Sequence, residues 1–336
     1  FTLAGMARAR LGSAWRLTDR HIDEMAESIY RCTACRRCTL ECPLGIDHAL
    51  MTHLMRHILS EMGLAPKALV VAVREQLEGD TRNTSAIPVA AMTDTCEFLE
   101  EELEEQFETD CIKFPIDVSD AEYVFFPAVS DYLLEADTLM GNAAVFHATG
   151  CSWTIGSGYF DGINYGLFYS DHVLERTIRK VVDEVTRLKG RKILIGECGH
   201  ASRSAHDFVP VFGAKEGYPV VNIMEYTYEK LMEGKLDLDP DVVTETVTYH
   251  DPCNIARSEW IIEKLHVEFE GRLRSGEASP NQVPLVKKRT PRGGTARSRQ
   301  PSPAPGVQPE AATVKVSPGE SRSRSTVPAE KPTAIL

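Results

Sequence analysis

Residues 32–43 read Cys-Thr-Ala-Cys-Arg-Arg-Cys-Thr-Leu-Glu-Cys-Pro, which places four cysteines within eleven positions. Three thiolates at three-residue spacing can wrap around one corner of a cubane, and a fourth followed by proline completes that cluster or reaches a neighbouring one. Zinc sites more often use Cys-x-x-Cys pairs separated by a longer loop. The spacing therefore predicts a 4Fe–4S cluster, with zinc or free thiols as the alternatives; its ligands would be Cys32, Cys35, Cys38 and Cys42.

Helical patterns flank this run on both sides. Asp19 can cap a first helix that extends to Ile29, and apolar residues at helical spacing over 50–62 predict a second helix after Pro43. We therefore expect residues 1–66 to form a small α-helical ferredoxin-like domain around the cluster. The chain contains one such run, so either Cys42 closes a solitary cluster or a second run lies upstream.

The period of the sequence changes after this segment. Residues 67–120 are expected to form a linker, with loops over 74–94 and an acidic amphipathic helix over 96–108. From residue 121, short apolar runs alternate with a helix over 174–188, which predicts βαβ units and a mainly parallel sheet. The predicted strands are 122–126, 143–146, 192–195, 220–223 and 245–249, within an α/β domain over 121–271.

Charge is unevenly distributed along the chain. Residues 272–336 contain 12 Lys and Arg against 4 Asp and Glu, whereas the whole chain has a net charge of −12. An acidic chain is a poor partner for nucleic acid. The basic Pro/Ser/Arg-rich tail lacks aromatic residues and is predicted to be disordered, either as a solvated tail, which we favour, or as an arm for an acidic partner.

The cysteine usage indicates a reducing compartment. The chain has nine cysteines, no apolar run of membrane-spanning length and no visible signal peptide. An odd count with four cysteines clustered argues against a disulfide framework, and we expect a cytoplasmic protein with metal-bound thiols.

A second candidate site lies in the predicted sheet. Cys198 follows the strand at 192–195, and Cys253 follows the strand at 245–249. Because the carboxyl ends of parallel strands share one edge, these two cysteines could converge there. Cys151 also follows a predicted strand and could lie near that edge, whereas Cys96 and Cys111 are expected to be structural thiols.

Histidines and glycines complete the set of candidates. His200 and His250 each lie beside a candidate cysteine and could deliver a proton or, as we favour, make a structural hydrogen bond. His53 and His57, at i and i+4, are expected to be surface or packing residues. The spacing of Gly156-Ser-Gly158 does not fit G-x-G-x-x-G, which favours an active-site or packing loop.

Three segments together resemble the heterodisulfide-reductase-like iron–sulfur proteins of the CCG-domain family. They are residues 30–43 around the cysteine run, Gly-Glu-Cys-Gly-His-Ala at 196–201 and Tyr-His-Asp-Pro-Cys-Asn-Ile-Ala-Arg at 249–257. Within the family, the branch of the DsrMKJOP complex of dissimilatory sulfur metabolism is the most similar. The cysteine run is common to many ferredoxins, and the His-Asp-Pro-Cys segment is far more specific to this family.

The resemblance implies an electron-transfer subunit at the inner face of the cytoplasmic membrane. Electrons would come from a haem-b quinol-oxidising membrane subunit, and the substrate would be a disulfide or trisulfide of a DsrC-like sulfur-carrier protein. It also implies a second, catalytic 4Fe–4S centre, for which Cys253 would be the leading ligand. Cys198 would be a remnant of the preceding repeat, with Glu197 where a paired cysteine would stand.

The sequence departs from the family pattern after Cys253, because no cysteine follows it. We therefore expect a truncated or frame-altered copy, in which a second centre forms only if other ligands complete it. Two alternatives stay open: the iron–sulfur subunit of a glycolate- or glycerol-3-phosphate-oxidising complex, and a relay module without catalysis of its own.

Overall fold

The structure of the chain, a computed structural model, describes residues 18–213, 217–236, 247–248, 253–256 and 313–314. It is a mixed α/β fold in two units, and nearly all of its elements belong to the unit of residues 1–236 and 252–266. The domain boundaries expected at residues 66, 120 and 271 stay predictions.

The cysteine run lies between two helices, as predicted. They are α2 (Asp19–Tyr30) and α4 (His48–Glu61), and the single-turn α3 (Arg37–Leu40) lies within the run. Thr18 rather than Asp19 is the N-cap of α2, and its N–H donates to the ring nitrogen of His21 at 3.2 Å. The side chain of Asp47 caps α4 by accepting from the N–H of Leu50 at 3.0 Å.

The loops predicted over 74–94 are mostly wrong. Helix α5 (Lys67–Glu78) occupies the start of that range, and α6 (Val89–Phe107) begins before its end, so only 79–88 connects them. Pro66 and Pro88 are the N-caps of these two helices. Proline is favoured at helix beginnings because its missing N–H would have no intrahelical partner there. The acidic amphipathic helix is confirmed, seven residues longer at its start than predicted.

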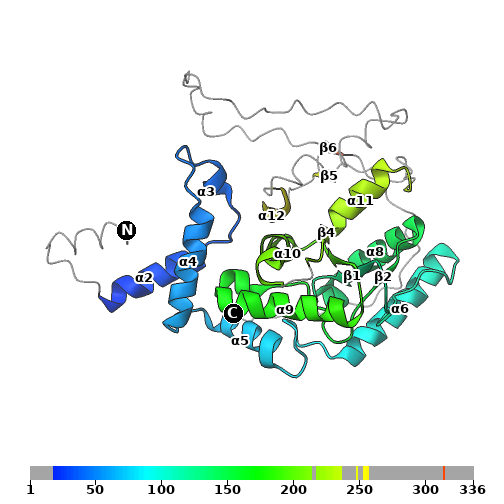
Figure 1. Ribbon diagram of the computed structural model, residues 1–336, viewed down its shortest axis with the longest axis horizontal. Helices are drawn as coiled ribbons and strands as arrows, with labels where there is room; N and C mark the ends of the chain where they lie inside the picture. The colour runs from blue at the N-terminus through cyan, green and yellow to red at the C-terminus, as the bar shows by residue number, and fades with distance from the viewer. Residues whose placement is uncertain (1–17, 214–216, 237–246, 249–252, 257–312, 315–336) are drawn as a thin grey trace, which may run out of the picture. The chain divides into compact units, whose positions relative to one another are not determined.

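A parallel sheet forms the centre of this unit, with strand order β2-β1-β3-β4 (Figure 1). The strands are β1 (Tyr123–Phe126), β2 (Trp153–Thr154), β3 (Lys192–Ile195) and β4 (Val220–Asn222). Three of the predicted strands are thereby confirmed, along with the parallel arrangement. The helices that follow β1 in this unit are α7 (Asp131–Leu134), α8 (Ala136–Thr149), η1 (Tyr165–Phe168), α9 (Asp171–Arg187), α10 (Gly199–Phe212), α11 (Ile223–Met232) and α12 (Cys253–Ala256).

Alternate side chains of β1 enter two separate hydrophobic layers. Tyr123 and Phe125 pack with buried residues of α6 and α8, whereas Val124 and Phe126 pack with those of α9 and α10. This is the two-residue period of a strand that is covered on both faces. The sheet is therefore covered by apolar side chains on both faces, and Cys198 follows the carboxyl end of β3.

The strand predicted at 143–146 is wrong, because these residues lie inside α8. A short apolar run has no period of its own, and here Leu139, Ala143 and Phe146 are buried at helical spacing. Consequently Cys151 follows a helix and precedes β2, which places it at the amino-terminal edge of the sheet.

The last predicted strand also lies outside the parallel sheet. Within 245–249, β5 (Val247–Thr248) pairs antiparallel with β6 (Thr313–Val314), and both belong to the second unit. Of the tail predicted to be disordered, 313–314 form this strand and the rest lies outside the described residues. Among the described residues, no helix has the length and apolar character needed to cross a bilayer.

Candidate iron–sulfur site

The loop that carries the four cysteines is tightly curled. Ala34 and Arg36 adopt left-handed backbone conformations, with φ of 55° and 60°. The N–H of Ala34 points at Cys32 Sγ, 3.4 Å away. The Cys38 side chain is exposed, and those of the other three cysteines are half-buried. The loop therefore presents its thiols near the surface and places a backbone donor against one sulfur.

Arg56 of α4 anchors the start of this loop. Its guanidinium donates to the carbonyl oxygen of Ile29 at 3.1 Å and to that of Cys32. It lies over the rings of Tyr30 and Phe168, at 5.6 and 5.2 Å from their centroids. Burial lowers the pKa of Arg56, and the nearby Cys32 opposes that effect. Sequence reasoning missed this residue, since a lone arginine on an amphipathic helix looks solvated.

Two side chains of α10 bind the backbone carbonyl groups of the next two loop residues, Thr33 and Ala34. His200 Nε2 lies 3.1 Å from the carbonyl oxygen of Thr33, and Arg203 Nη1 donates to that of Ala34 at 3.1 Å. Burial lowers the pKa of His200. The structural hydrogen bond favoured for His200 is thus present. Together with Arg56, these side chains contact three consecutive carbonyl groups of the loop.

Cys198 lies where the sequence placed it, at the carboxyl end of β3 as the N-cap of α10. Burial raises the pKa of the Cys198 thiol, whereas backbone N–H groups of Ala201 and His200 that bond the sulfur act in the opposite direction. Glu197 contacts Asp131, and burial together with this neighbouring carboxyl raises the pKa of Asp131.

Cys253 reaches the same region by a different route from the one predicted. The strand that precedes Cys253, β5, does not join the parallel sheet. Cys253 is the first residue of α12, and α12 packs directly on α10. A Cβ built on Gly199 would lie 3.4 Å from Cβ of Asn254 and 3.5 Å from Ile255. Helix α10, whose N-cap is Cys198, and α12, which begins at Cys253, are therefore neighbours, and α10 contacts the cysteine loop through His200 and Arg203.

The donor set agrees in kind with an iron–sulfur cluster. Four thiols share one loop with a backbone N–H directed at a sulfur, and such hydrogen bonds tune cluster potentials. Among the described residues, no three His, Cys, Asp or Glu side chains are placed to hold a single metal ion. In a cubane each cysteine binds a different iron, so its ligands need not meet at one point as zinc ligands do.

The remaining candidates lie apart from this loop or serve packing. Cys96 is buried, which raises the pKa of its thiol to about 12, as expected for a structural cysteine. Cys111 and Cys151 line a cavity of about 380 Å³ that also includes Trp153, near the amino-terminal edge of the sheet. His250 lies outside the described residues.

The helical histidine pair joins α4 to α9. His53 Nε2 lies 2.5 Å from a carboxylate oxygen of Asp171, and the N–H of Asp171 donates to His57 Nδ1 at 3.2 Å. The other ring nitrogen of His53 lies 3.2 Å from the carbonyl oxygen of Leu167. The expected packing role is thus observed.

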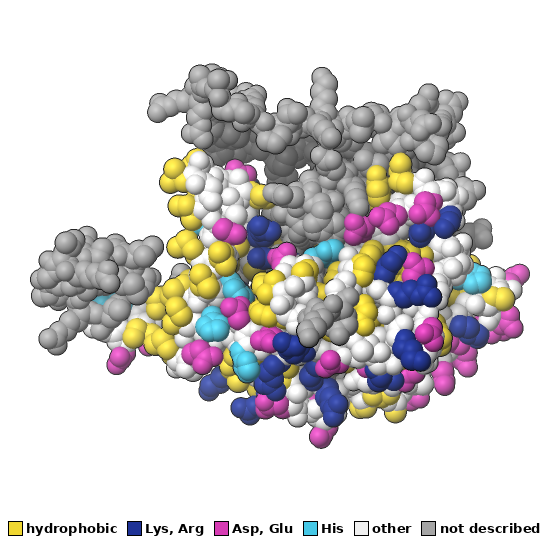
Figure 2. Space-filling view, viewed as in Figure 1, with side chains coloured by type: hydrophobic (Ala, Val, Ile, Leu, Met, Phe, Trp, Pro, Cys, Tyr) yellow, Lys and Arg dark blue, Asp and Glu magenta, His cyan; other side chains and the backbone are white. Residues whose placement is uncertain are grey.

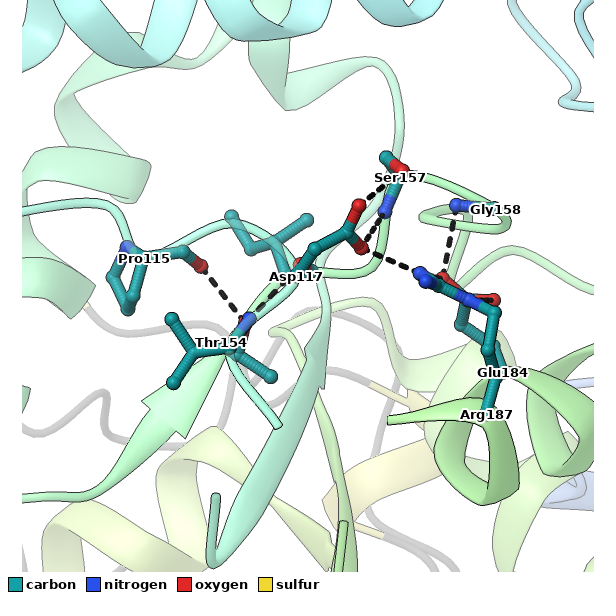
Figure 3. Close-up of polar contacts among 9 residues, drawn as sticks. Pro115, Asp117, Thr154, Ser157, Gly158, Glu184 and Arg187 are labelled. Atoms are coloured by element: carbon teal, nitrogen blue, oxygen red, sulfur yellow. Dashed lines mark hydrogen bonds and ion pairs between the residues drawn. The ribbon is translucent and has the colours of Figure 1, made fainter. Parts of the chain in front are cut away.

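The glycine-rich loop is a packing loop, the second of the two alternatives (Figure 3). Glu184 of α9 accepts from the N–H of Gly158 at 2.9 Å and from Arg187, which also donates to Asp117. A Cβ at Gly156 would overlap the Glu184 carboxylate. Glycine is present because the buried carboxylate leaves no room for a side chain.

Comparisons with known proteins support the resemblance. The chain is 25% identical over 305 residues to an "Hdr-like menaquinol oxidoreductase iron-sulfur subunit" of Archaeoglobus profundus, covering 79% of this chain and 54% of that protein. It is 21% identical over 259 residues to a subunit of the dihydromethanophenazine:CoB--CoM heterodisulfide reductase of Methanosarcina mazei, covering 74% and 58%. A "Probable membrane-anchored ferredoxin" of Chromohalobacter salexigens is 23% identical over 239 residues, covering 69% and 33%.

No family model matches the chain, and no solved structure matches it. The chain spans about half the length of the curated relatives it matches. These relatives, at 20–25% identity, support an iron–sulfur protein that is similar to the heterodisulfide-reductase-like (Hdr-like) subunits.

Proposed function

We propose that the chain carries a 4Fe–4S cluster and relays electrons within a membrane-associated, Hdr-like complex. The cluster ligands would be Cys32, Cys35, Cys38 and Cys42. The observation that carries this proposal is the cysteine loop, whose three carbonyls at 32–34 are each held by a side chain from α4 or α10. The names of the relatives, which include iron–sulfur subunits of a menaquinol oxidoreductase and a component of a heterodisulfide reductase, agree with it.

The electrons would be used to reduce a sulfur–sulfur bond at Cys198 and Cys253. A cubane passes one electron at a time, whereas cleavage of a sulfur–sulfur bond takes two, and a cluster that binds sulfur directly can store the intermediate state. The two cysteines begin helices that pack on each other beside the cysteine loop. The described residues bring two cysteines to this place, so further ligands would be required for a complete second centre.

The family resemblance extends this proposal to substrate and partners. The substrate would be a disulfide or trisulfide on a DsrC-like sulfur-carrier protein. The electron donor would be a haem-b quinol-oxidising membrane subunit, which would hold this chain at the inner face of the cytoplasmic membrane. A relay module without catalysis is the second candidate, and the two-cysteine donor count at Cys198 and Cys253 favours it.

Quantification of iron and sulfide in anaerobically reconstituted full chain tests the proposal. About four irons per chain indicates one cubane and the relay, and about eight indicates a second centre. A disulfide-reduction assay with a low-potential dye as donor then distinguishes relay from reductase. Reconstituted protein that binds no iron would overturn the proposal.

A further inference from the structure

A continuous series of hydrogen bonds joins the cysteine loop to Cys253. At one end, the N–H of Ala34 donates to Cys32 Sγ at 3.4 Å. The carbonyl oxygen of Ala34 accepts from Arg203 Nη1 at 3.1 Å, and the same nitrogen donates to Asn254 Oδ1 at 3.4 Å. At the other end, Asn254 Nδ2 donates to Cys253 Sγ at 3.4 Å.

Arg203 is the central member of this series. Its side chain is only 10% exposed, and its Nε lies 3.3 Å from a carboxylate oxygen of Asp207, one turn along α10. Burial lowers the pKa of Arg203, but a guanidinium stays charged in proteins. Its planar group presents several donors in fixed directions, so one side chain can bond the loop and Asn254 together. A lysine amine lacks that fixed fork.

Asn254 is equally confined. It is buried at 2% exposure, and its amide uses one end for Arg203 and the other for the Cys253 sulfur. Within the described residues, this amide is the link between the guanidinium and the second sulfur site. The pair therefore connects the cysteine loop to Cys253 through hydrogen bonds, and the largely buried, Asp207-paired guanidinium of Arg203 lies between Ala34 and Asn254.

We propose that Arg203 and Asn254 are positioning residues that couple the cysteine run to Cys253, with the Arg203 charge favouring the electron-rich state of the cluster. This inference rests on the proposed function, since it takes the cysteine run as the cluster site. A positive charge in a poorly solvated place stabilises added negative charge more than the same charge at the surface does. Arg203 thereby raises the reduction potential, and Asn254 restrains the Cys253 thiol.

Two variants separate the two roles. Arg203→Gln removes the charge and the fork, whereas Asn254→Ala keeps the charge and releases Cys253. Arg179→Gln is the matched control, because Arg179 forms an i, i+4 ion pair with Glu175 on α9 and is exposed. All are made in the full chain and purified anaerobically.

The first measurement is the reduction potential of the reconstituted cluster, followed by EPR. We expect a shift to more negative potential in Arg203→Gln and no shift in Asn254→Ala or Arg179→Gln. The second is the alkylation rate of Cys253 by iodoacetamide, quantified by peptide mass spectrometry. We expect a severalfold increase in both Arg203→Gln and Asn254→Ala.

The possible outcomes are distinguishable. Iron-loaded Arg203→Gln with an unchanged potential, or Asn254→Ala with unchanged Cys253 alkylation, would overturn the inference and leave the proposed function intact. A wild-type chain without iron would overturn the proposed function itself. If Arg203→Gln does not fold, Arg203→Lys replaces it: a retained potential with faster Cys253 alkylation supports the inference, and unchanged alkylation overturns it.

Discussion

The cysteine-rich helical segment and the parallel sheet are held together by different physical means. The sheet is sandwiched between two layers of buried apolar side chains. The cysteine loop is instead held by polar side chains that end on its backbone carbonyls, from Arg56, His200 and Arg203. Apolar burial is spread over many residues, whereas each of these polar contacts depends on one residue.

The apolar surface of the two regions differs as well. On α3, α4 and the loop between them, large apolar side chains are exposed, as Figure 2 shows in yellow. They are Leu40, Leu44, Ile46, Leu50, Met51, Leu54 and Ile58. The stripe predicted over 50–62 is therefore helical in spacing, yet the described residues leave most of it uncovered.

The largest expected effect is a difference between the two regions in how much unfolding free energy is lost when one apolar side chain is truncated. Phe126 is fully buried in β1, and Phe126→Ala should lower the free energy of unfolding by about 3–5 kcal/mol. Leu50 of α4 is 52% exposed, and Leu50→Ala should change it by less than about 0.5 kcal/mol. Urea denaturation measures both. Similar losses would mean that the stripe on α4 is covered in solution.

A pH-dependent effect is expected in the sheet region. Burial raises the pKa of Asp161 from 3.8 to about 6, although several backbone N–H groups that it accepts from oppose this. Because the folded state binds this proton more tightly than the unfolded state, the stability that it contributes falls as pH rises from about 4 to about 6. The total is on the order of 3 kcal/mol.

Denaturation at several pH values measures this effect. In Asp161→Asn the part of the fall between pH 4 and pH 6 that Asp161 contributes, on the order of 3 kcal/mol, should be missing from the stability profile. A wild-type profile that matches that of the variant throughout this range would contradict the assigned shift.

A smaller effect is expected in the packing loop. Gly156→Ala places a Cβ against the Glu184 carboxylate and should cost about 1–3 kcal/mol of stability. Gly141, inside α8, has open space around its Cα, so Gly141→Ala should stabilise by about 0.5–1 kcal/mol. Melting temperatures give the order of the two variants. A neutral Gly156→Ala would show that Glu184 moves aside freely.

Sequence periodicity predicted most of the sheet region, because its residues repeat at two- and 3.6-residue intervals. It placed β1, β3, β4 and α9 correctly, and it did not predict the two-residue β2. It failed at 143–146, where four apolar residues fit either period, and at 245–249, which does not join the parallel sheet. It also gave the cysteine run and the place of Cys198. Arg56, Arg203 and Asn254 could not be predicted, because each bonds a group far away in sequence and only the fold brings them together.

Whether the cysteine run binds a cluster can be decided by comparing three proteins. The full chain and two variants, Cys35→Ala and Cys96→Ala, are reconstituted anaerobically, reduced and compared by iron content and EPR. We expect about four irons and a cubane signal in the wild type, loss of the signal in Cys35→Ala, and retention in Cys96→Ala, whose thiol is buried in the core. Colourless, iron-free wild type, or equal loss in both variants, would contradict this expectation.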